Sequence, residues 1–166
     1  MAHDAARSLA LAALLAAALG GCAKNPVAES SLEVGAGRVA GAVTPSQQDF
    51  AATAGDRVFF EGDSTELDAA AQSTLEKQAR WLNQYSRLSF TVEGHADERG
   101  TREYNFALGA RRAEVTKDYL IAHGVSAGRI HTISFGKERP VATCDDISCW
   151  SRNRRAATVL GGGGQS

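Results

Sequence analysis

The sequence has no excess of positive charge and few aromatic residues, and these two shortages exclude one large class of partners. It carries 18 Lys and Arg against 19 Asp and Glu, a formal net charge of -1, and only 7% of its residues are aromatic. Proteins that bind nucleic acid rely on a cationic surface, and those that bind single strands add aromatic stacking platforms. The composition therefore predicts no nucleic-acid partner.

A long hydrophobic run is also missing. The unbroken apolar stretch at residues 9–19 has eleven residues, whereas a membrane-spanning helix needs roughly 20. Its length fits the apolar part of a secretory signal. Leu19-Gly20-Gly21-Cys22 ends this stretch and resembles the bacterial lipobox, whose cysteine is lipidated and becomes the first mature residue. We therefore expect a lipoprotein signal peptide over residues 1–21 and an acylated Cys22, with a plain signal peptide and a chance cysteine as the alternative.

The residue after the cysteine and the composition that follows it predict where the chain resides and how it is organised. Ala23 stands where an Asp would resemble an inner-membrane retention signal, so we expect a lipid anchor in the outer membrane and a domain in the periplasm. Residues 22–55 lack a stripe of large apolar side chains and are expected to form a flexible tether, with a short helix at 46–53. Residues 56–160 form the predicted domain, and 161–166 form a tail.

Within the predicted domain, apolar residues alternate between the period of a strand and the period of a helix. The strand signals fall at 58–60, 88–92, 130–135 and 156–160, and Gly94 is expected to end the second. The helical signals cover 68–85, with Asp68 as N-cap, and 102–123, with Gly124 at the C-terminal end. This order, β-α-β-α-β-(loop)-β, predicts an α+β two-layer sandwich with one core of about 100 residues.

One charged residue breaks the pattern of the second helix. At 100° per residue, Arg112 lies roughly 40° from Leu108 and so on the edge of the buried stripe, with Asn105 on the same edge. A buried guanidinium needs an anionic partner, and Asp97 in the preceding loop is the nearest acid. Asp97 and Arg112 facing each other across a cleft would bind a zwitterion, with the acid taking an ammonium and the arginine a carboxylate. The alternative is a structural Asp–Arg pair without a ligand.

Several motifs of the chain resemble the OmpA-like peptidoglycan-binding domain family. In the family's order they are residues 91–100 (Thr-Val-Glu-Gly-His-Ala-Asp-Glu-Arg-Gly), Glu103-Tyr-Asn, Leu108-Gly, Arg111-Arg-Ala113, residues 134–140 (Ser-Phe-Gly-Lys-Glu-Arg-Pro) and Asn153-Arg-Arg-Ala156. The resemblance implies binding of diaminopimelate in the peptidoglycan stem peptide, a residue with an ammonium and a carboxylate on one side-chain carbon. It places the family's ligand-binding residues at Asp97, Arg112 and Asn105, puts Glu61 where the family has Asp, and suggests Arg154 as a further lining residue.

The lipobox and these motifs together resemble the lipoprotein members of that family, which also fixes the expected partners. The resemblance implies peptidoglycan and TolB as partners, with TolA or other outer-membrane proteins as further candidates, and a role in the Tol envelope system at cell division. The anchor in outer-membrane lipid would be the acylated Cys22. Because Glu61 replaces the family's Asp, the alternative is a Tol-system interaction module whose peptidoglycan binding is weak or lost.

Catalytic and metal chemistry have weaker signals. A wall hydrolase would need two groups that flank one bond, and the adjacent Asp97 and Glu98 are unsuited to that. His95, Asp97 and Glu98 form one short cluster without a second ligand group at zinc spacing. We therefore predict no enzyme, no catalytic residue, no metal and no cofactor. In an exported protein, Cys144 and Cys149 are expected to form a disulfide, and a redox or metal pair is the alternative.

Overall fold

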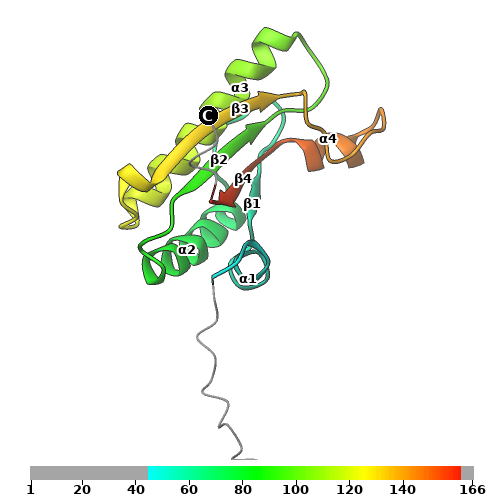
Figure 1. The fold of residues 1–166 in the computed structure, drawn as a ribbon. Helices are drawn as coiled ribbons and strands as arrows, with labels where there is room; N and C mark the ends of the chain where they lie inside the picture. Colours follow the sequence, from blue (N-terminus) through cyan, green and yellow to red (C-terminus); the bar gives the residue numbers. More distant parts are fainter. Residues whose placement is uncertain (1–44, 162–166) are drawn as a thin grey trace, which may run out of the picture. The chain divides into compact units, whose positions relative to one another are not determined.

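The structure is a computed structural model that describes residues 45–161; the predicted signal peptide, Cys22, most of the expected tether and the tail lie outside these residues. The elements follow in the order α1 (Gln47–Thr53), β1 (Arg57–Phe59), α2 (Ala69–Gln84), β2 (Phe90–His95), α3 (Arg102–Ala122), the 3-10 turn η1 (Ala127–Arg129), β3 (Ile130–Gly136), α4 (Ile147–Asn153) and β4 (Arg155–Leu160) (Figure 1). The predicted α+β class and the order of strands and long helices are confirmed. The predicted loop before the last strand contains α4.

The strands form one mixed sheet in the order β1-β4-β2-β3. The strand β4 runs antiparallel to both β1 and β2, and β2 runs parallel to β3. Consequently β1, β2 and β3 end at the same edge of the sheet, which is also where β4 begins. The segments that follow β1 and β2 and the residue that precedes β4 therefore meet there, and they carry Glu61, Asp97 and Arg154.

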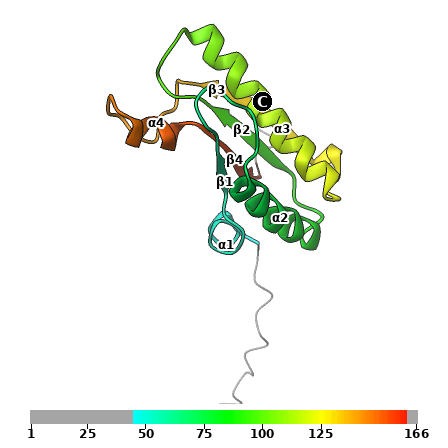
Figure 2. The same ribbon diagram turned by 180° about the vertical axis from the view of Figure 1, so that it is seen from behind.

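The helices α2 and α3 pack on the sheet and on each other (Figure 2). Both begin as the sequence predicts, since Asp68 caps α2 by accepting a hydrogen bond from the Ala71 amide, at 2.7 Å, and Thr101 caps α3. Their apolar faces and the strands enclose the core, whose fully buried members include Leu75, Leu82, Phe90, Val92 and Leu120. None of the helices of residues 45–161 combines the length and apolar character that a membrane span requires.

A close contact between backbones sets the position of α3 on the sheet. Gly94 was expected to end its strand, but β2 continues through it to His95. Glycine at this position serves packing rather than strand termination, because a Cβ atom on Gly94 would lie 1.8 Å from the carbonyl oxygen of Gly109 in α3. The two glycines let the helix approach the strand without side chains between them. This contact holds the face of α3 that carries Asn105 and Arg112 against the end of β2.

The helix α1 lies in the segment that the sequence assigns to the tether. Its Phe50 is fully buried, and its ring centroid lies 4.9 Å from that of Trp81 in α2. The Trp81 indole donates to an Asp49 carboxylate oxygen at 3.0 Å, and Ser46 caps the helix. The core therefore extends upstream of residue 56, where the sequence places the start of the domain.

Candidate functional site

The loop between β2 and α3 holds a carboxylate that is already bound by arginine. Asp97 is 7% exposed. Its Oδ1 accepts hydrogen bonds from the Arg99 backbone N–H at 3.2 Å and from Arg99 Nε at 3.1 Å, and its Oδ2 accepts from an Arg99 terminal nitrogen at 2.6 Å. Burial raises the pKa of Asp97, but the hydrogen bonds from Arg99 outweigh it and leave the pKa below its usual range. Asp97 is thus an anion at neutral pH.

A second arginine reaches the same carboxylate from the start of β4. Arg154 is 3% exposed. One of its terminal nitrogens lies 3.4 Å from Asp97 Oδ2, the other lies 3.9 Å from a carboxylate oxygen of Glu61, and its Nε donates to the Phe60 carbonyl at 2.9 Å. The structure therefore places Arg154, Asp97 and Glu61 together. Glu61 itself is an outward-facing member, because its side chain is 92% exposed.

Arg112 is fully buried, as its place on α3 predicts, but its partners differ from the expected ones. Its three nitrogens donate to backbone carbonyls: Nε to Ser64 at 3.0 Å, and the terminal nitrogens to His95 at 2.9 Å and to Gly62 at 2.6 Å. Within residues 45–161, no carboxylate lies within 4 Å of its guanidinium. The expected direct pair with Asp97 is therefore absent in this state.

The cause of that difference is the segment after β1, which folds over the guanidinium. Carbonyl oxygens of Gly62 and Ser64 accept hydrogen bonds from Arg112, where the sequence led us to expect a carboxylate. Burial and, to a smaller extent, the nearby Arg154 lower the pKa of Arg112 to about 10, against a smaller opposing effect of Asp97. Arg112 therefore stays charged at neutral pH and is compensated by dipoles rather than by an ion pair.

Asn105 contributes to the site by fixing the loop backbone. It is 2% exposed, and its side-chain amide donates to the Arg99 carbonyl at 2.7 Å. Lys137, at the start of the segment after β3, donates to the carbonyls of Glu98 at 3.1 Å and Gly100 at 2.6 Å. The loop backbone is thus held from two elements. Lys137 and Arg99 lie inside the motifs quoted above, but no local pattern distinguishes either of them as a site residue.

Two cavities open beside these residues. One, of about 320 Å³, is bordered by Phe60, Glu61 and Arg154 among others, and the other, of about 260 Å³, is bordered by Gly62, Asp63, Arg99, Gly100 and Tyr104. Residues 61–64 contribute to both cavities and also provide two of the carbonyls that cover Arg112. Arg154 thus borders the first cavity and Arg99 the second, whereas Arg112 borders neither and is covered by carbonyls of residues 62–64.

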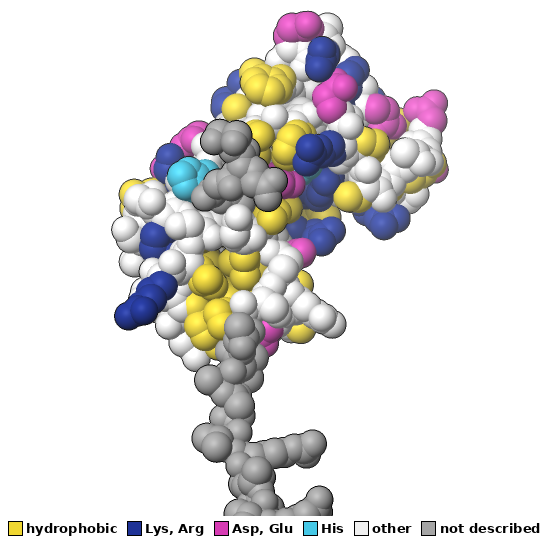
Figure 3. Space-filling view, in the orientation of Figure 1, with side chains coloured by type: hydrophobic (Ala, Val, Ile, Leu, Met, Phe, Trp, Pro, Cys, Tyr) yellow, Lys and Arg dark blue, Asp and Glu magenta, His cyan; other side chains and the backbone are white. Residues whose placement is uncertain are grey.

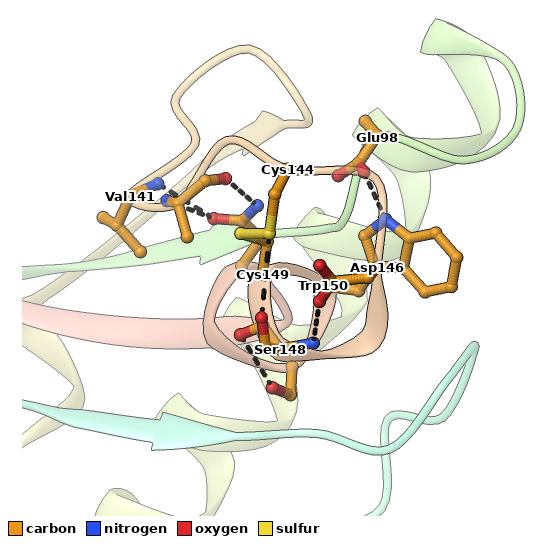
Figure 4. Close-up of a disulfide and its surroundings, with 10 residues drawn as sticks. Glu98, Val141, Cys144, Asp146, Ser148, Cys149 and Trp150 are labelled. Carbon is orange, nitrogen blue, oxygen red and sulfur yellow. Dashed lines mark hydrogen bonds between the residues drawn. A yellow bond between two sulfur atoms is a disulfide. The ribbon is translucent and has the colours of Figure 1, made fainter.

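The segment before β4 carries the predicted disulfide. Cys144 and Cys149 are bonded, with their Cα atoms 5.6 Å apart, and Cys149 lies in α4. The next residue, Trp150, donates from its indole to a carboxylate oxygen of Glu98, in the Asp97 loop (Figure 4). The guanidinium carbon of Arg99 lies 4.2 Å from the centroid of the Trp150 ring. The disulfide therefore borders the site rather than standing apart from it.

The remaining titratable groups suggest no second centre in the described part of the chain. No group of three His, Cys, Asp or Glu side chains in residues 45–161 is arranged to hold a metal ion. His95 is 1% exposed, neither ring nitrogen has a hydrogen-bond partner there, and burial together with Arg155 and Arg139 lowers its pKa to about 3. It is therefore neutral. On the face shown in Figure 3, basic and acidic side chains are interspersed.

Comparison with known proteins gives consistent matches. The model of the OmpA family matches residues 59–154. The chain is 60% identical over 155 residues to the peptidoglycan-associated lipoprotein of Agrobacterium fabrum, covering 93% of this chain and 88% of that protein, and 44% identical over 155 residues to that of Pseudomonas aeruginosa, covering 91% and 92%. The crystal structure of the peptidoglycan-associated lipoprotein from Burkholderia pseudomallei superposes with a TM-score of 0.62 at 38% identity, covering 63% of this chain and 89% of that one.

Proposed function

The chain belongs to the OmpA family and, within it, to the peptidoglycan-associated lipoproteins (Pal), and from this premise we propose that it tethers the outer membrane to the wall without covalent bonds. Acyl chains on Cys22 would hold it in the outer membrane, because several chains together anchor a protein stably. The folded domain would lie in the periplasm and bind the diaminopimelate of the stem peptide. Binding at one stem peptide can be weak, since many tethers act along one wall.

The observation that supports this site is a buried carboxylate, Asp97, held by two arginines that each border a cavity, Arg154 and Arg99. Asp97 is the proposed partner of the diaminopimelate ammonium, and Arg154 and Arg112 provide the positive charge for its carboxylate. Arg154 borders the cavity beside Glu61 and is the arginine that an entering carboxylate meets first. Asn105 holds the loop that presents Asp97.

We assign Arg112 a direct role only in the bound state. Three of its five N–H groups donate to carbonyls, and two of those carbonyls belong to residues 62–64. A ligand carboxylate that displaced these two carbonyls would offer the guanidinium a charged acceptor in place of neutral ones and could bind its fork bidentately. Glu61, next to this segment, contributes through its backbone in this scheme, since its side chain points to solvent.

The second candidate is a protein-interaction module of the Tol-Pal system with weak wall binding. It is favoured by the occupancy of the site, because Arg99 and Arg154 already contact Asp97 and carbonyls already fill the fork of Arg112. On this reading TolB, or TolA and other outer-membrane proteins, would be the principal partners. The domain's role in division would then depend on those contacts more than on the wall.

Sedimentation with purified diaminopimelate-type sacculi distinguishes the two readings. The protein purified in detergent is compared with Asp97→Asn, which removes the charge and keeps the shape, and with Asp118→Asn, a matched change on the far part of α3. We expect the protein and Asp118→Asn to pellet and folded Asp97→Asn to stay in solution. If all three pellet alike, Asp97 is not the wall site. If the unaltered protein stays in solution, the Tol-Pal reading takes first place.

A further inference from the structure

The arginine that holds Asp97 is partly exposed, whereas the other two arginines of the site, Arg154 and Arg112, are buried. The side chain of Arg99 is 47% exposed, against 8% for Asp97. Its fork contacts both oxygens of the carboxylate, at 3.1 Å to Oδ1 and 2.6 Å to Oδ2. An ammonium arriving from the solvent would therefore meet an acid whose two oxygens are already engaged by a cation from the same loop.

The backbone of the Asp97 loop is held in place, whereas the side chain of Arg99 can move away from Asp97. The Arg99 carbonyl accepts from buried Asn105, and the carbonyls on either side accept from Lys137. These bonds fix the backbone without restraining the guanidinium. Removal of Arg99 from Asp97 therefore requires only rotation about side-chain bonds into the solvent beside the cavity of about 260 Å³ that this residue borders.

One aromatic ring holds the guanidinium in place over the acid. Arg99 stacks on Trp150, 4.2 Å from the ring centroid, a geometry in which the cation is attracted by the ring face. Trp150 is itself oriented by its hydrogen bond to Glu98 and by its position next to Cys149 of the disulfide (Figure 4). Asp97, Glu98 and Arg99 are consecutive in the chain. The Trp150 ring therefore contacts the two residues that directly follow the acid.

We propose that Arg99 is an internal competitor for Asp97, held there by Trp150, and that the ligand's ammonium must displace it. This rests on the proposed function, in which Asp97 binds that ammonium. Such a competitor sets specificity. When a simple amine binds Asp97, it only replaces one cation by another, so it makes no contact beyond the one that Arg99 loses. A zwitterion gains in addition the contacts of its carboxylate with Arg154 and Arg112, so the zwitterion displaces Arg99 where a simple amine does not.

The test is a gain of affinity rather than a loss. The detergent-purified protein, Arg99→Gln and Arg102→Gln are titrated with diaminopimelate-type sacculi, with free diaminopimelic acid and with a simple alkylamine as competitors. Arg102 is the matched control, since it is exposed and pairs with Glu138 instead of Asp97. We expect Arg99→Gln to bind sacculi roughly fivefold more tightly, the scale of one partly exposed ion pair, and to be inhibited by the alkylamine. Arg102→Gln should match the unaltered protein.

A second variant tests the part assigned to the ring. Trp150→Leu should raise the affinity in the same direction, and the double variant Arg99→Gln/Trp150→Leu should bind no more tightly than Arg99→Gln alone, because the ring acts through the arginine. Folding is checked by thermal melts. If folded Arg99→Gln binds sacculi as the unaltered protein does or more weakly, Arg99 is not a competitor. If Asp97→Asn also retains full binding, the proposed function fails as well, so the two failures are distinguishable.

Discussion

The carbonyl partners of Arg112 allow a quantitative prediction about what this residue does for the fold. We consider Arg112→Met, which removes the charge and the three donors but keeps an aliphatic side chain of similar reach. Arg111→Met is the matched control, because Arg111 is the neighbouring arginine of α3 and is exposed. Only the first change leaves carbonyls without donors inside the domain.

The size of the effect follows from the surroundings of each carbonyl. The bond to the His95 carbonyl is buried, so its loss costs the full desolvation of that acceptor, about 2 kcal/mol. The carbonyls of Gly62 and Ser64 are partly buried and can turn toward water, which reduces their loss to about 1 kcal/mol each. Removing a guanidinium that lacks an ion-pair partner returns about 1 kcal/mol of its desolvation. The free energy of unfolding should fall by about 3 kcal/mol.

Urea titration and thermal melting of the two variants measure this loss. A loss of about 3 kcal/mol corresponds to a fall of about 12 °C in Tm for a domain of this size, and Arg111→Met should stay within about 2 °C of the unaltered protein. If Arg112→Met also melts within about 2 °C, the carbonyls gain as much from water as from the arginine. The buried charge would then be maintained for a ligand, and Arg112 would have no stabilising role in the fold.

Further predictions concern packing, protonation, the disulfide and the wall. Gly94→Ala would put a Cβ atom 1.8 Å from the backbone of α3, so circular dichroism should show a largely unfolded protein, whereas Gly128→Ala, which has open space around it, should melt normally. Burial lowers the pKa of His95 from 6.5 to about 3, so unfolding takes up a proton between these values. Its contribution to stability is therefore lost as the pH falls below 6.5, by about 1.4 kcal/mol per pH unit, and the urea midpoint of His95→Gln should depend less on pH there. The double change Cys144→Ser/Cys149→Ser should lower the free energy of unfolding by roughly 2 kcal/mol, the loop-entropy value for so short a loop; an unchanged urea midpoint would contradict it. Sacculi with amidated diaminopimelate should bind more weakly, because amidation removes the carboxylate, and equal pelleting would contradict that role of the arginines.

The periodicity of apolar residues was enough to predict the four strands and the two long helices, because these elements bury whole faces. The two short helices differ in how far the sequence predicts them. A short helix was expected at 46–53, where α1 lies, but Phe50 is the single large apolar residue that α1 buries, so no repeat indicates that this helix belongs to the core. In α4 only Cys149 and Asn153 are buried, and its position depends on the disulfide and on contacts of Trp150 that no local pattern encodes.

The sequence indicated which residues the structure brings together, but not the contacts that they make. Asp97, Arg112 and Asn105 were identified from helical phase and motif, and the structure brings them to one edge of the sheet with Arg154. Their partners could not be deduced, because Arg112 binds carbonyls 48 to 50 positions away in the chain, and every residue has a carbonyl. The contact of Arg99 with Asp97 spans only two positions, but a nearby Arg–Asp pair in a loop is common and gives no sign that it occupies a ligand site.

In these contacts, the backbone that carries Asp97 and Arg112 is held firmly, whereas the groups that contact the two charged side chains can be replaced by others. The backbone of the Asp97 loop is held by Asn105 and Lys137, and α3 is held by its glycine contact with β2, so the framework does not need to change when a ligand enters. In the proposed binding, the partner of each charge changes: Arg99 would leave Asp97, and the carbonyls of residues 62–64 would leave Arg112. A protein partner that presents a cation and a carboxylate at this edge would compete for the same two groups. Wall and protein binding at this site are therefore expected to exclude each other, and free diaminopimelic acid should inhibit both with the same inhibition constant.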